Sequence, residues 1–193
     1  MKKVSIENKK NVFNGFFKLE EVQLRFEKFN GEMSPVVKRL SLERGDSIAV
    51  LVLNITTRHL ILVNQFRYST YKHGQGWIIE TIAGMIDPGE TPEEAARREV
   101  QEEVGLNIST LEHISTFYLS PGGSSERIHL YYSEVSGENA KYVENGGMIS
   151  EGEDIKAEEM SLEEALLKVK SGEIMDAKTI AGIYWLENRQ LKK

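Results

Sequence analysis

The chain has 193 residues, of which 40% are hydrophobic, and this is enough to build one large domain or a domain with a small addition. With 24 basic and 30 acidic residues the net charge is −6, which disfavours a nucleic-acid partner because phosphate binding needs a basic excess. The chain has no cysteine, so a bound metal must use oxygen or imidazole ligands. The N-terminus has no apolar signal region, and no apolar run approaches the roughly 20 residues of a membrane span. We therefore expect a cytoplasmic protein with no membrane partner.

The N-terminal part has the pattern of paired strands. Val22, Leu24 and Phe26 alternate with polar residues, and Asn30-Gly31 is typical of a hairpin turn. This pattern predicts an antiparallel β segment over residues 1–45, ahead of a main domain over residues 46–193.

The main domain combines strands and helices. Apolar runs at residues 48–53 and 60–63 predict buried central strands, and further strands are expected at 78–82, 114–119 and 128–132. Thr91, Pro92 and Glu94 form a helix start signal, so we expect a helix from about Pro92 to Val104 that ends at Gly105. Two later helices are expected, one from Ser161 to about residue 170 and one from Asp176 to residue 185, after a loop at 137–154 without pattern. The prediction is an α/β (α+β) fold in which helices cover a mixed sheet.

Acidic residues are concentrated on the helix expected at 92–104. Glu99, Glu102 and Glu103 can share one side of it because they are spaced three and four residues apart. Alone, this pattern would indicate a solvated acidic face. Glu90 lies just before the helix, however, and a glycine turn brings a strand end beside it, which gives the oxygen cluster that hard divalent cations prefer.

The segment GMIDPGETPEEAARREVQEEVGL, residues 84–106, resembles the Nudix box at every fixed position. The resemblance implies a Nudix fold, with a mixed β-sheet between helices, and hydrolysis of nucleoside diphosphates linked to another group. It implies Mg²⁺ or Mn²⁺ as cofactor, with two or more ions per site. By resemblance the metal ligands are the Ala83 carbonyl, Glu99, Glu102 and Glu103. Arg98 is the catalytic-site arginine that orients a glutamate, for which we choose Glu90.

Outside the box, the resemblance is to the ADP-ribose pyrophosphatase and GDP-mannose hydrolase subfamily. It includes Gln65-Phe66-Arg67, residues 80–85, and the Ser-Pro-Gly-Gly loop with Pro121, and it extends over nearly the whole chain. It implies a homodimer in which the N-terminal segments are exchanged and the site is shared. The expected reaction is ADP-ribose to AMP and ribose 5-phosphate.

The subfamily resemblance also assigns residues to the reaction and to the substrate. A loop glutamate acts as general base, for which we choose Glu151, with Glu153 second. Arg67 is expected on the phosphates and Arg39 on phosphate or nucleotide. Two assignments have alternatives of similar weight: Phe16 stacks on the base or packs structurally, and Glu126 contacts a metal or ribose or pairs with Arg127.

Several alternative functions are weighed against ADP-ribose hydrolysis. GDP-mannose hydrolysis to GMP and mannose 1-phosphate uses the same metals and phosphate contacts, and broad activity on several sugar nucleotides is compatible with the same motifs. A Nudix-fold nucleotide sensor is disfavoured because Glu90, Glu99, Glu102 and Glu103 are all present. Two further Nudix activities, sanitation of the nucleoside triphosphate pool and RNA decapping, are disfavoured by the N-terminal segment and the Pro121 loop.

Overall fold

The computed structural model describes residues 2–147 and 152–192 of the chain. Its contacts divide the chain into two compact units. The first unit consists of residues 1–45 and 118–127, and the second of residues 46–117 and 128–193. None of the described helices is long and apolar enough to cross a membrane.

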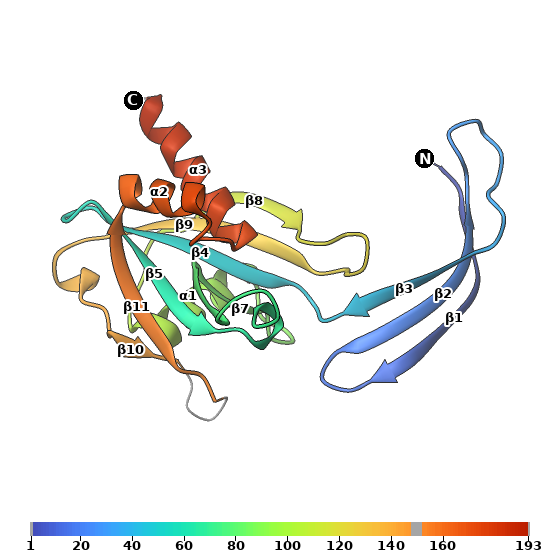
Figure 1. Ribbon diagram of the computed structural model, residues 1–193, viewed down its shortest axis with the longest axis horizontal. Helices are drawn as coiled ribbons and strands as arrows, with labels where there is room; N and C mark the ends of the chain where they lie inside the picture. Colours follow the sequence, from blue (N-terminus) through green and yellow to red (C-terminus); the bar gives the residue numbers. More distant parts are fainter. Residues whose placement is uncertain (1, 148–151, 193) are drawn as a thin grey trace. The chain divides into compact units, whose positions relative to one another are not determined.

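The first unit is a three-stranded antiparallel sheet with the order β1-β2-β3 (Figure 1). The strands are β1 (Val4–Asn14), β2 (Lys18–Phe26) and β3 (Val37–Glu43). Gly31 has a φ of 85° in the turn between β2 and β3, which a glycine adopts without strain. This hairpin is the one that Asn30-Gly31 predicts.

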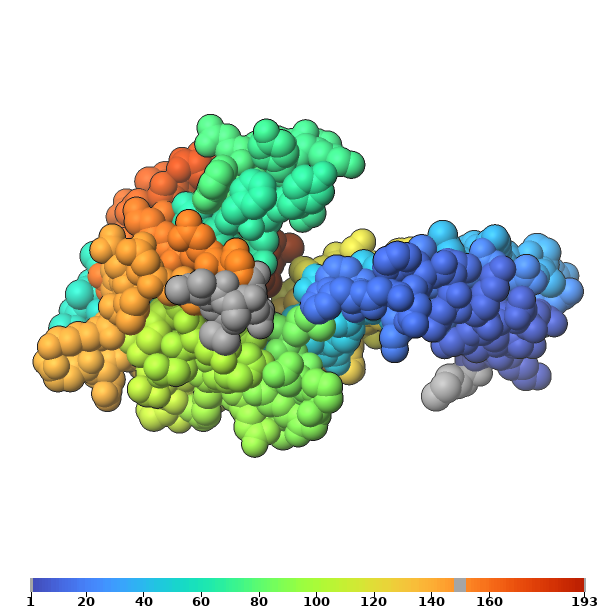
Figure 2. Space-filling model, turned by 90° about the horizontal axis from the view of Figure 1, so that it is seen from below, coloured from blue at the N-terminus to red at the C-terminus, as the bar shows by residue number. Residues whose placement is uncertain are grey.

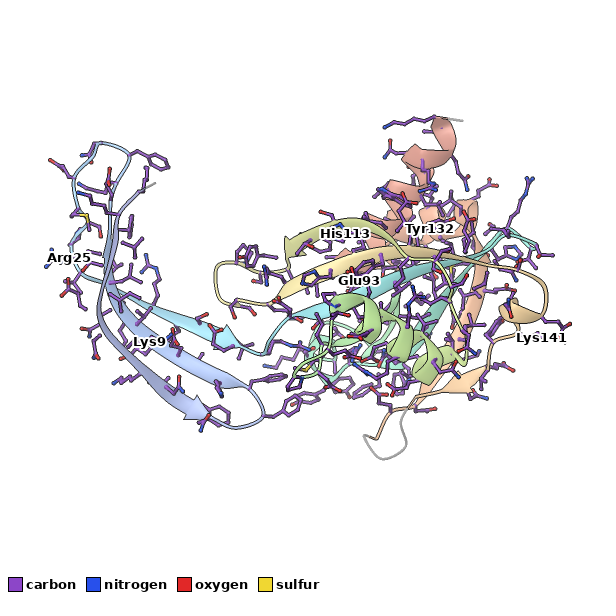
Figure 3. All side chains as sticks on the ribbon, turned by 180° about the vertical axis from the view of Figure 1, so that it is seen from behind. Lys9, Arg25, Glu93, His113, Tyr132 and Lys141 are labelled. Atoms are coloured by element: carbon purple, nitrogen blue, oxygen red, sulfur yellow. The ribbon has the colours of Figure 1, made fainter. Side chains whose placement is uncertain are left out.

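Ion pairs join the strands of this sheet. Lys9 Nζ lies 2.5 Å from Glu20 Oε2 across β1 and β2, and Arg25 Nε lies 3.3 Å from Glu7 Oε1. Figure 3 labels Lys9 and Arg25 on these strands. Every residue of β1 is exposed, so β1 lacks the buried apolar alternation that identifies a strand in a sequence. For this reason the alternation of Val22, Leu24 and Phe26, which predicts a strand, lies in β2 and not in β1.

The loop at residues 118–127 belongs to the first unit and pairs with β3. Leu42 N donates to Gly123 O at 2.8 Å, and Ser125 N donates to Leu42 O at 3.2 Å. Ser125 Oγ also donates to Glu43 Oε2 at 2.5 Å. The Ser-Pro-Gly-Gly loop is therefore held on the strand that ends the N-terminal segment.

The second unit contains an eight-stranded sheet with the order β10-β11-β5-β4-β9-β8. In addition β6 pairs with β5 and β7 with β4. The pairing of β4 with β9 is parallel, whereas β10–β11, β11–β5, β5–β4, β5–β6 and β4–β7 are antiparallel. The strands are β4 (Ser47–Asn54), β5 (His59–Phe66), β6 (Trp77–Glu80), β7 (Ile82–Met85), β8 (Glu112–Tyr118), β9 (Arg127–Val135), β10 (Asn145–Gly146) and β11 (Ile155–Ser161).

Helices cover both faces of this sheet (Figure 1). Successive residues of β4 point to opposite faces, so Ile48, Val50 and Val52 pack with α1 (Pro92–Val104), whereas Leu51 and Leu53 pack on the other side. That other side is covered by α2 (Leu162–Ser171) and α3 (Ala177–Leu191). Every residue of β4 is buried, as its unbroken apolar run predicts for a central strand.

The predicted helices and central strands are confirmed, with shifts at their ends. The last helix continues to Leu191, and the segment expected to lack structure contains a short 3₁₀ helix at Gly137–Ala140 and strand β10. The division of the chain into domains at residue 45 stays a prediction. The contacts add residues 118–127 to the first unit, a link between distant segments that strand and turn patterns do not reveal.

Candidate active site

Helix α1 begins and ends as its sequence predicts. Thr91 Oγ1 accepts from Glu94 N and the Glu94 carboxylate accepts from Thr91 N, which completes a capping box. Gly105 follows the helix with a φ of 71°, the left-handed conformation typical of a helix end. The helix therefore has a fixed start and end, and it presents its carboxylates at defined positions.

Arg98 is the centre of an ion-pair network. Its Nε and Nη2 donate in parallel to Glu90 Oε1 and Oε2 at 3.0 and 2.9 Å. Its Nη1 donates to Glu99 Oε1 at 2.8 Å and to Glu102 Oε2 at 3.0 Å, and Nη2 also reaches the Met85 carbonyl at 3.0 Å. The hydrogen bond from Arg98 holds the pKa of Glu90 below its ordinary value. Arg98 thus connects the turn before α1, the end of β7 and two glutamates of the helix.

Glu99 lies directly against the backbone of β7. A Cβ atom added to Gly84 would come within 1.9 Å of Glu99 Oε1, so only glycine at this position leaves room for the carboxylate. Burial raises the pKa of Glu99, while Arg98 opposes that rise. Ala83, whose carbonyl is an expected metal ligand, is the neighbouring residue of the same strand.

Glu103 is a buried carboxylate with an unpartnered oxygen. It is 3% exposed, and among the described residues its Oε2 has no hydrogen-bond partner. Burial, followed by the negative charges of Glu99 and Glu153, raises its pKa well above the ordinary value. A buried carboxylate of this kind is costly unless a cation or donor compensates it.

The segment after the 3₁₀ helix at 137–140 is tied to the end of α1. Val143 N donates to Val104 O at 2.9 Å, and a Cβ atom on Gly146 would lie 1.8 Å from Glu103 O. A Cβ atom on Gly147 would in turn lie 3.0 Å from Glu153 Cβ. Glu153 therefore lies close to the segment that contacts the end of α1, and its charge acts on Glu103. Glu151 lies outside the described residues.

The residues fit a divalent cation by their chemistry. Three observations favour a bound cation here. Glu103 has an unpartnered oxygen, the Glu99 carboxylate lies against Gly84, and Glu99, Glu103 and Glu153 repel one another. No group of three or more acidic or histidine side chains within residues 2–147 and 152–192 is already arranged around a single metal position. In this structure Glu99 Oε1 and Glu102 Oε2 both accept hydrogen bonds from the Arg98 guanidinium.

Arg67, expected on the substrate phosphates, comes directly after β5. Its Nε lies 2.7 Å from Glu80 Oε2, and its side chain is 37% exposed. Arg67 also lowers the pKa of Glu103 through its charge, so it belongs to the same electrostatic neighbourhood. Figure 2 shows α1 (yellow-green) on the surface of the second unit, and also the protruding segment that follows Arg67 (blue-green).

The other expected substrate residues belong to the first unit. Phe16 is 85% exposed and contacts the Phe17 ring edge-on, with 4.8 Å between ring centres. Arg39, on β3, is exposed and donates to the Lys38 carbonyl. Glu126 is buried and lies 3.4 Å from Arg44 Nε. The substrate roles of Phe16, Arg39 and Glu126 stay predictions.

A buried charged cluster at the start of α3 is not among the predicted site residues. Lys178 is 7% exposed and contacts both Glu80 and Asp176, although Asp176 was expected only as a helix cap. A signal for it does exist in the sequence: Lys178, Gly182 and Leu186 are spaced four apart, and the latter two positions are apolar and buried. A lysine on the buried stripe of a helix indicates a buried anionic partner.

Comparison with known proteins agrees with this geometry. The NUDIX domain family model matches residues 43–181. The chain is 36% identical to a Haemophilus influenzae protein named ADP-ribose pyrophosphatase, over 95% of this chain and 86% of that one. It is 35% identical to an Escherichia coli K12 protein of the same name, over 95% of this chain and 88% of that one.

A second group of relatives has a different name. A Cronobacter sakazakii protein named GDP-mannose pyrophosphatase is 39% identical over 79% of this chain and 78% of that one. A solved structure titled as an ADP compounds hydrolase has the same fold, with a TM-score of 0.69 at 20% identity over 97% of this chain and 96% of that one. The family model matches residues 43–181, and two relatives align with 95% of the chain. This chain therefore belongs to the NUDIX domain family and is a Nudix hydrolase.

Proposed function

We propose that the protein hydrolyses the diphosphate bond of a nucleoside diphosphate sugar, and that ADP-ribose is its substrate. The relatives named ADP-ribose pyrophosphatase align with 95% of the chain, which supports this substrate. The observation that carries the reaction type is the buried Glu103 carboxylate with its unpartnered oxygen, beside Glu99. A site that concentrates uncompensated negative charge is suited to a cation-bound diphosphate.

In the proposed reaction, water adds to one phosphorus and the bridging P–O bond breaks. One product is AMP and the other is ribose 5-phosphate, and the water proton passes to a base. Glu99, Glu103 and the Ala83 carbonyl are the proposed ligands of the cation, with Glu102 assisting. Bound divalent ions, Mg²⁺ or Mn²⁺ and two or more in number, supply screening of the diphosphate charge and activation of water.

The chain's own groups position this chemistry. Arg98 holds Glu90 and restrains Glu99 and Glu102, so the carboxylates keep their place before substrate arrives. Arg67 offers a guanidinium for the phosphates. Glu151 is the proposed general base and Glu153 the second choice. The nearness of Glu153 to Glu99 and Glu103 supports a base from this segment.

GDP-mannose is the second candidate substrate. The 39% identity to a relative named GDP-mannose pyrophosphatase favours it. The products would be GMP and mannose 1-phosphate, formed by the same bond cleavage with the same metal and phosphate contacts. Only contacts to base and sugar would distinguish the two substrates.

The test is hydrolysis of ADP-ribose, GDP-mannose, ADP-glucose, UDP-glucose, NADH and 8-oxo-dGTP with Mg²⁺ or Mn²⁺, compared by kcat/KM. We expect ADP-ribose to lead and to yield AMP. If GDP-mannose leads, the reaction type stands and the substrate changes. Tight binding of a panel member without cleavage would instead indicate a sensor. In H₂¹⁸O, the phosphate that carries the label identifies the attacked phosphorus.

We also propose that the first unit pairs two copies of the chain. Its sheet leaves the large apolar side chains of Val4, Ile6, Phe13 and Phe29 between 60% and 101% exposed. Apolar surface of this kind is typical of an interaction site. Light scattering after size-exclusion chromatography should give twice the chain mass of 21.9 kDa, and a monomer mass would contradict the pairing.

A further inference from the structure

A series of ion pairs connects the start of α3 with Arg67. Lys178 Nζ donates to Asp176 Oδ1 at 2.8 Å and to Glu80 Oε1 at 2.6 Å. The second oxygen of Glu80 accepts from Arg67 Nε at 2.7 Å. The Lys178 and Glu80 side chains are 9% and 4% exposed, while that of Arg67 is 37% exposed. The series of ion pairs therefore extends from buried side chains to Arg67, which is partly exposed to solvent.

Asp176 anchors the inner end of this series. Its Oδ2 accepts from Thr179 N at 2.9 Å and so caps α3. Thr179 in turn accepts a hydrogen bond from Thr81 N on its Oγ1 at 2.7 Å, and both threonines are fully buried. Because Oδ2 is used by the cap, Oδ1 is directed to Lys178. The helix start and the end of β6 are thus locked together around the Lys178–Glu80 pair.

The outer end fixes one edge of the Arg67 guanidinium. Arg67 N donates to Gly76 O at 2.7 Å, and its Nε donates to Glu80. Within the described part of the chain, neither terminal nitrogen of Arg67 makes a hydrogen bond. Among the described residues, Glu80 holds the Nε edge and none occupies the two terminal nitrogens.

Stability alone does not account for this arrangement. A buried ion pair is often no better for stability than well-packed apolar side chains, because removing both charges from water is costly. Lys178 lies on the buried stripe of α3, where an apolar residue would satisfy the core. What the lysine adds is a fixed partner for one oxygen of Glu80.

We propose that Lys178 is a positioning residue for substrate binding, which holds Glu80 so that Glu80 holds Arg67 by its Nε edge alone. This rests on the proposed function, in which Arg67 binds the substrate phosphates. With Oε1 occupied by Lys178, Glu80 offers only Oε2 to the guanidinium. Without Lys178, both Glu80 oxygens become available, and Arg67 can turn to pair with them in the bidentate mode that guanidinium favours. Its terminal nitrogens are then withdrawn from the substrate.

The experiment is a double-mutant cycle between Lys178→Met and Arg67→Ala, measured on the panel substrate that the wild type cleaves best. We expect Arg67→Ala to raise KM by about 10- to 100-fold, the size of a lost charge-assisted contact. Lys178→Met should raise KM about tenfold with kcat within about threefold. In the Arg67→Ala background, Lys178→Met should leave KM unchanged, because the residue through which it acts is gone.

Two further variants control for folding and for charge. Asp176→Asn keeps a good helix cap but turns an amide toward Lys178, so it should raise KM in the same direction while Tm stays near the wild-type value. Lys168→Met removes a lysine that pairs with Glu173 on the surface of α2 and should change neither parameter.

The outcomes separate the two proposals. A KM effect of Lys178→Met that is equally large with and without Arg67 overturns the positioning role, as does a loss of Tm with KM unchanged in both Lys178→Met and Asp176→Asn. If the wild type cleaves no panel member, the proposed function fails.

In that case the double-mutant cycle is measured by calorimetric binding of inorganic pyrophosphate with Mg²⁺. If the affinity losses of Lys178→Met and Arg67→Ala are not additive in that measurement, they still support the positioning role of Lys178 through Glu80 and Arg67.

Discussion

Arg98 and Glu90 form a two-point ion pair in which Nε and Nη2 face the two carboxylate oxygens at 3.0 and 2.9 Å. Two parallel bonds fix the plane of the guanidinium as well as its position. The third nitrogen, Nη1, is thereby aimed at Glu99 and Glu102. The pair connects the turn before α1 with the carboxylates proposed as metal ligands.

Arg98→Lys should weaken the site although it keeps the charge. An ammonium cannot make the two parallel bonds, so Glu90, Glu99 and Glu102 lose their common support. We expect kcat/KM to fall by about 10- to 100-fold, as when groups that orient metal ligands are removed. In a titration of activity with Mn²⁺, the concentration that gives half-maximal activity should rise at the same time, because the metal binds more weakly. Arg97→Lys is the matched control, and equal losses in both variants would contradict the specific role of Arg98.

Glu103→Gln should remove most metal-dependent turnover without unfolding the protein. The amide is similar in size but lacks the charge that the cation needs. In EDTA, the Tm of this variant should equal or exceed that of the wild type, because a buried carboxylate with an unpartnered oxygen is removed. Steady-state assays with Mg²⁺ measure the turnover, and thermal scans in EDTA measure the Tm. Turnover at the wild-type level would exclude Glu103 as a ligand.

Gly84→Ala should displace Glu99. The added methyl group would lie 1.9 Å from Glu99 Oε1, so the carboxylate must leave its place against β7. A shift of about 1 Å in a catalytic group can cost about 100-fold in rate, and we expect a loss of kcat of that order. Gly74→Ala is the control, since nothing lies within 4 Å of its added Cβ atom. A fully active Gly84→Ala enzyme would show that the position of Glu99 does not matter.

The choice between the two loop glutamates can be made by paired variants. Glu151→Gln should lower kcat far more than it changes KM, as expected for a group that acts in the transition state. Glu153→Gln should have the smaller effect on kcat. Single-turnover kinetics at saturating substrate separate the chemical step from product release. The reverse ranking would transfer the role of base to Glu153.

The contact between β3 and the loop at 118–127 should depend on pH. Hydrogen bonds from Ser125 and then Ser41 hold the pKa of Glu43 below its ordinary value of 4.5. A carboxyl whose folded pKa is lowered stabilises the fold above pH 4.5 and loses that contribution as pH falls through its folded pKa. The loop should therefore loosen in acid.

Amide hydrogen exchange at Leu42 and Ser125 measures this loosening, because both amides bridge β3 and the loop. Glu43→Gln should reduce their protection factors at pH 7, and the difference from the wild type should shrink below pH 4.5. Glu7→Gln, which alters an ion pair between β1 and β2, is the control. A difference that persists unchanged into acid would exclude Glu43 as the group responsible.

The sequence by itself determined the parts of this protein that depend on neighbouring residues. Thr91, Pro92, Glu94 and Gly105 specify both ends of α1, because caps act within one turn of helix. Unbroken apolar runs specify the central strands β4 and β5, which are buried on both faces. The spacing of Glu99, Glu102 and Glu103 places them on one helix, and the same residues carry the family resemblance.

Tertiary structure alone decided which of these groups are compensated. Glu80 and Lys178 are 98 positions apart in the chain, and their contact forms only because α3 packs against the sheet beside β6. The same long-range packing leaves Glu103 Oε2 without a described partner and gives Arg98 four acceptor groups. Local patterns report propensity and periodicity, whereas burial and charge pairing are set by segments that meet only in the folded chain.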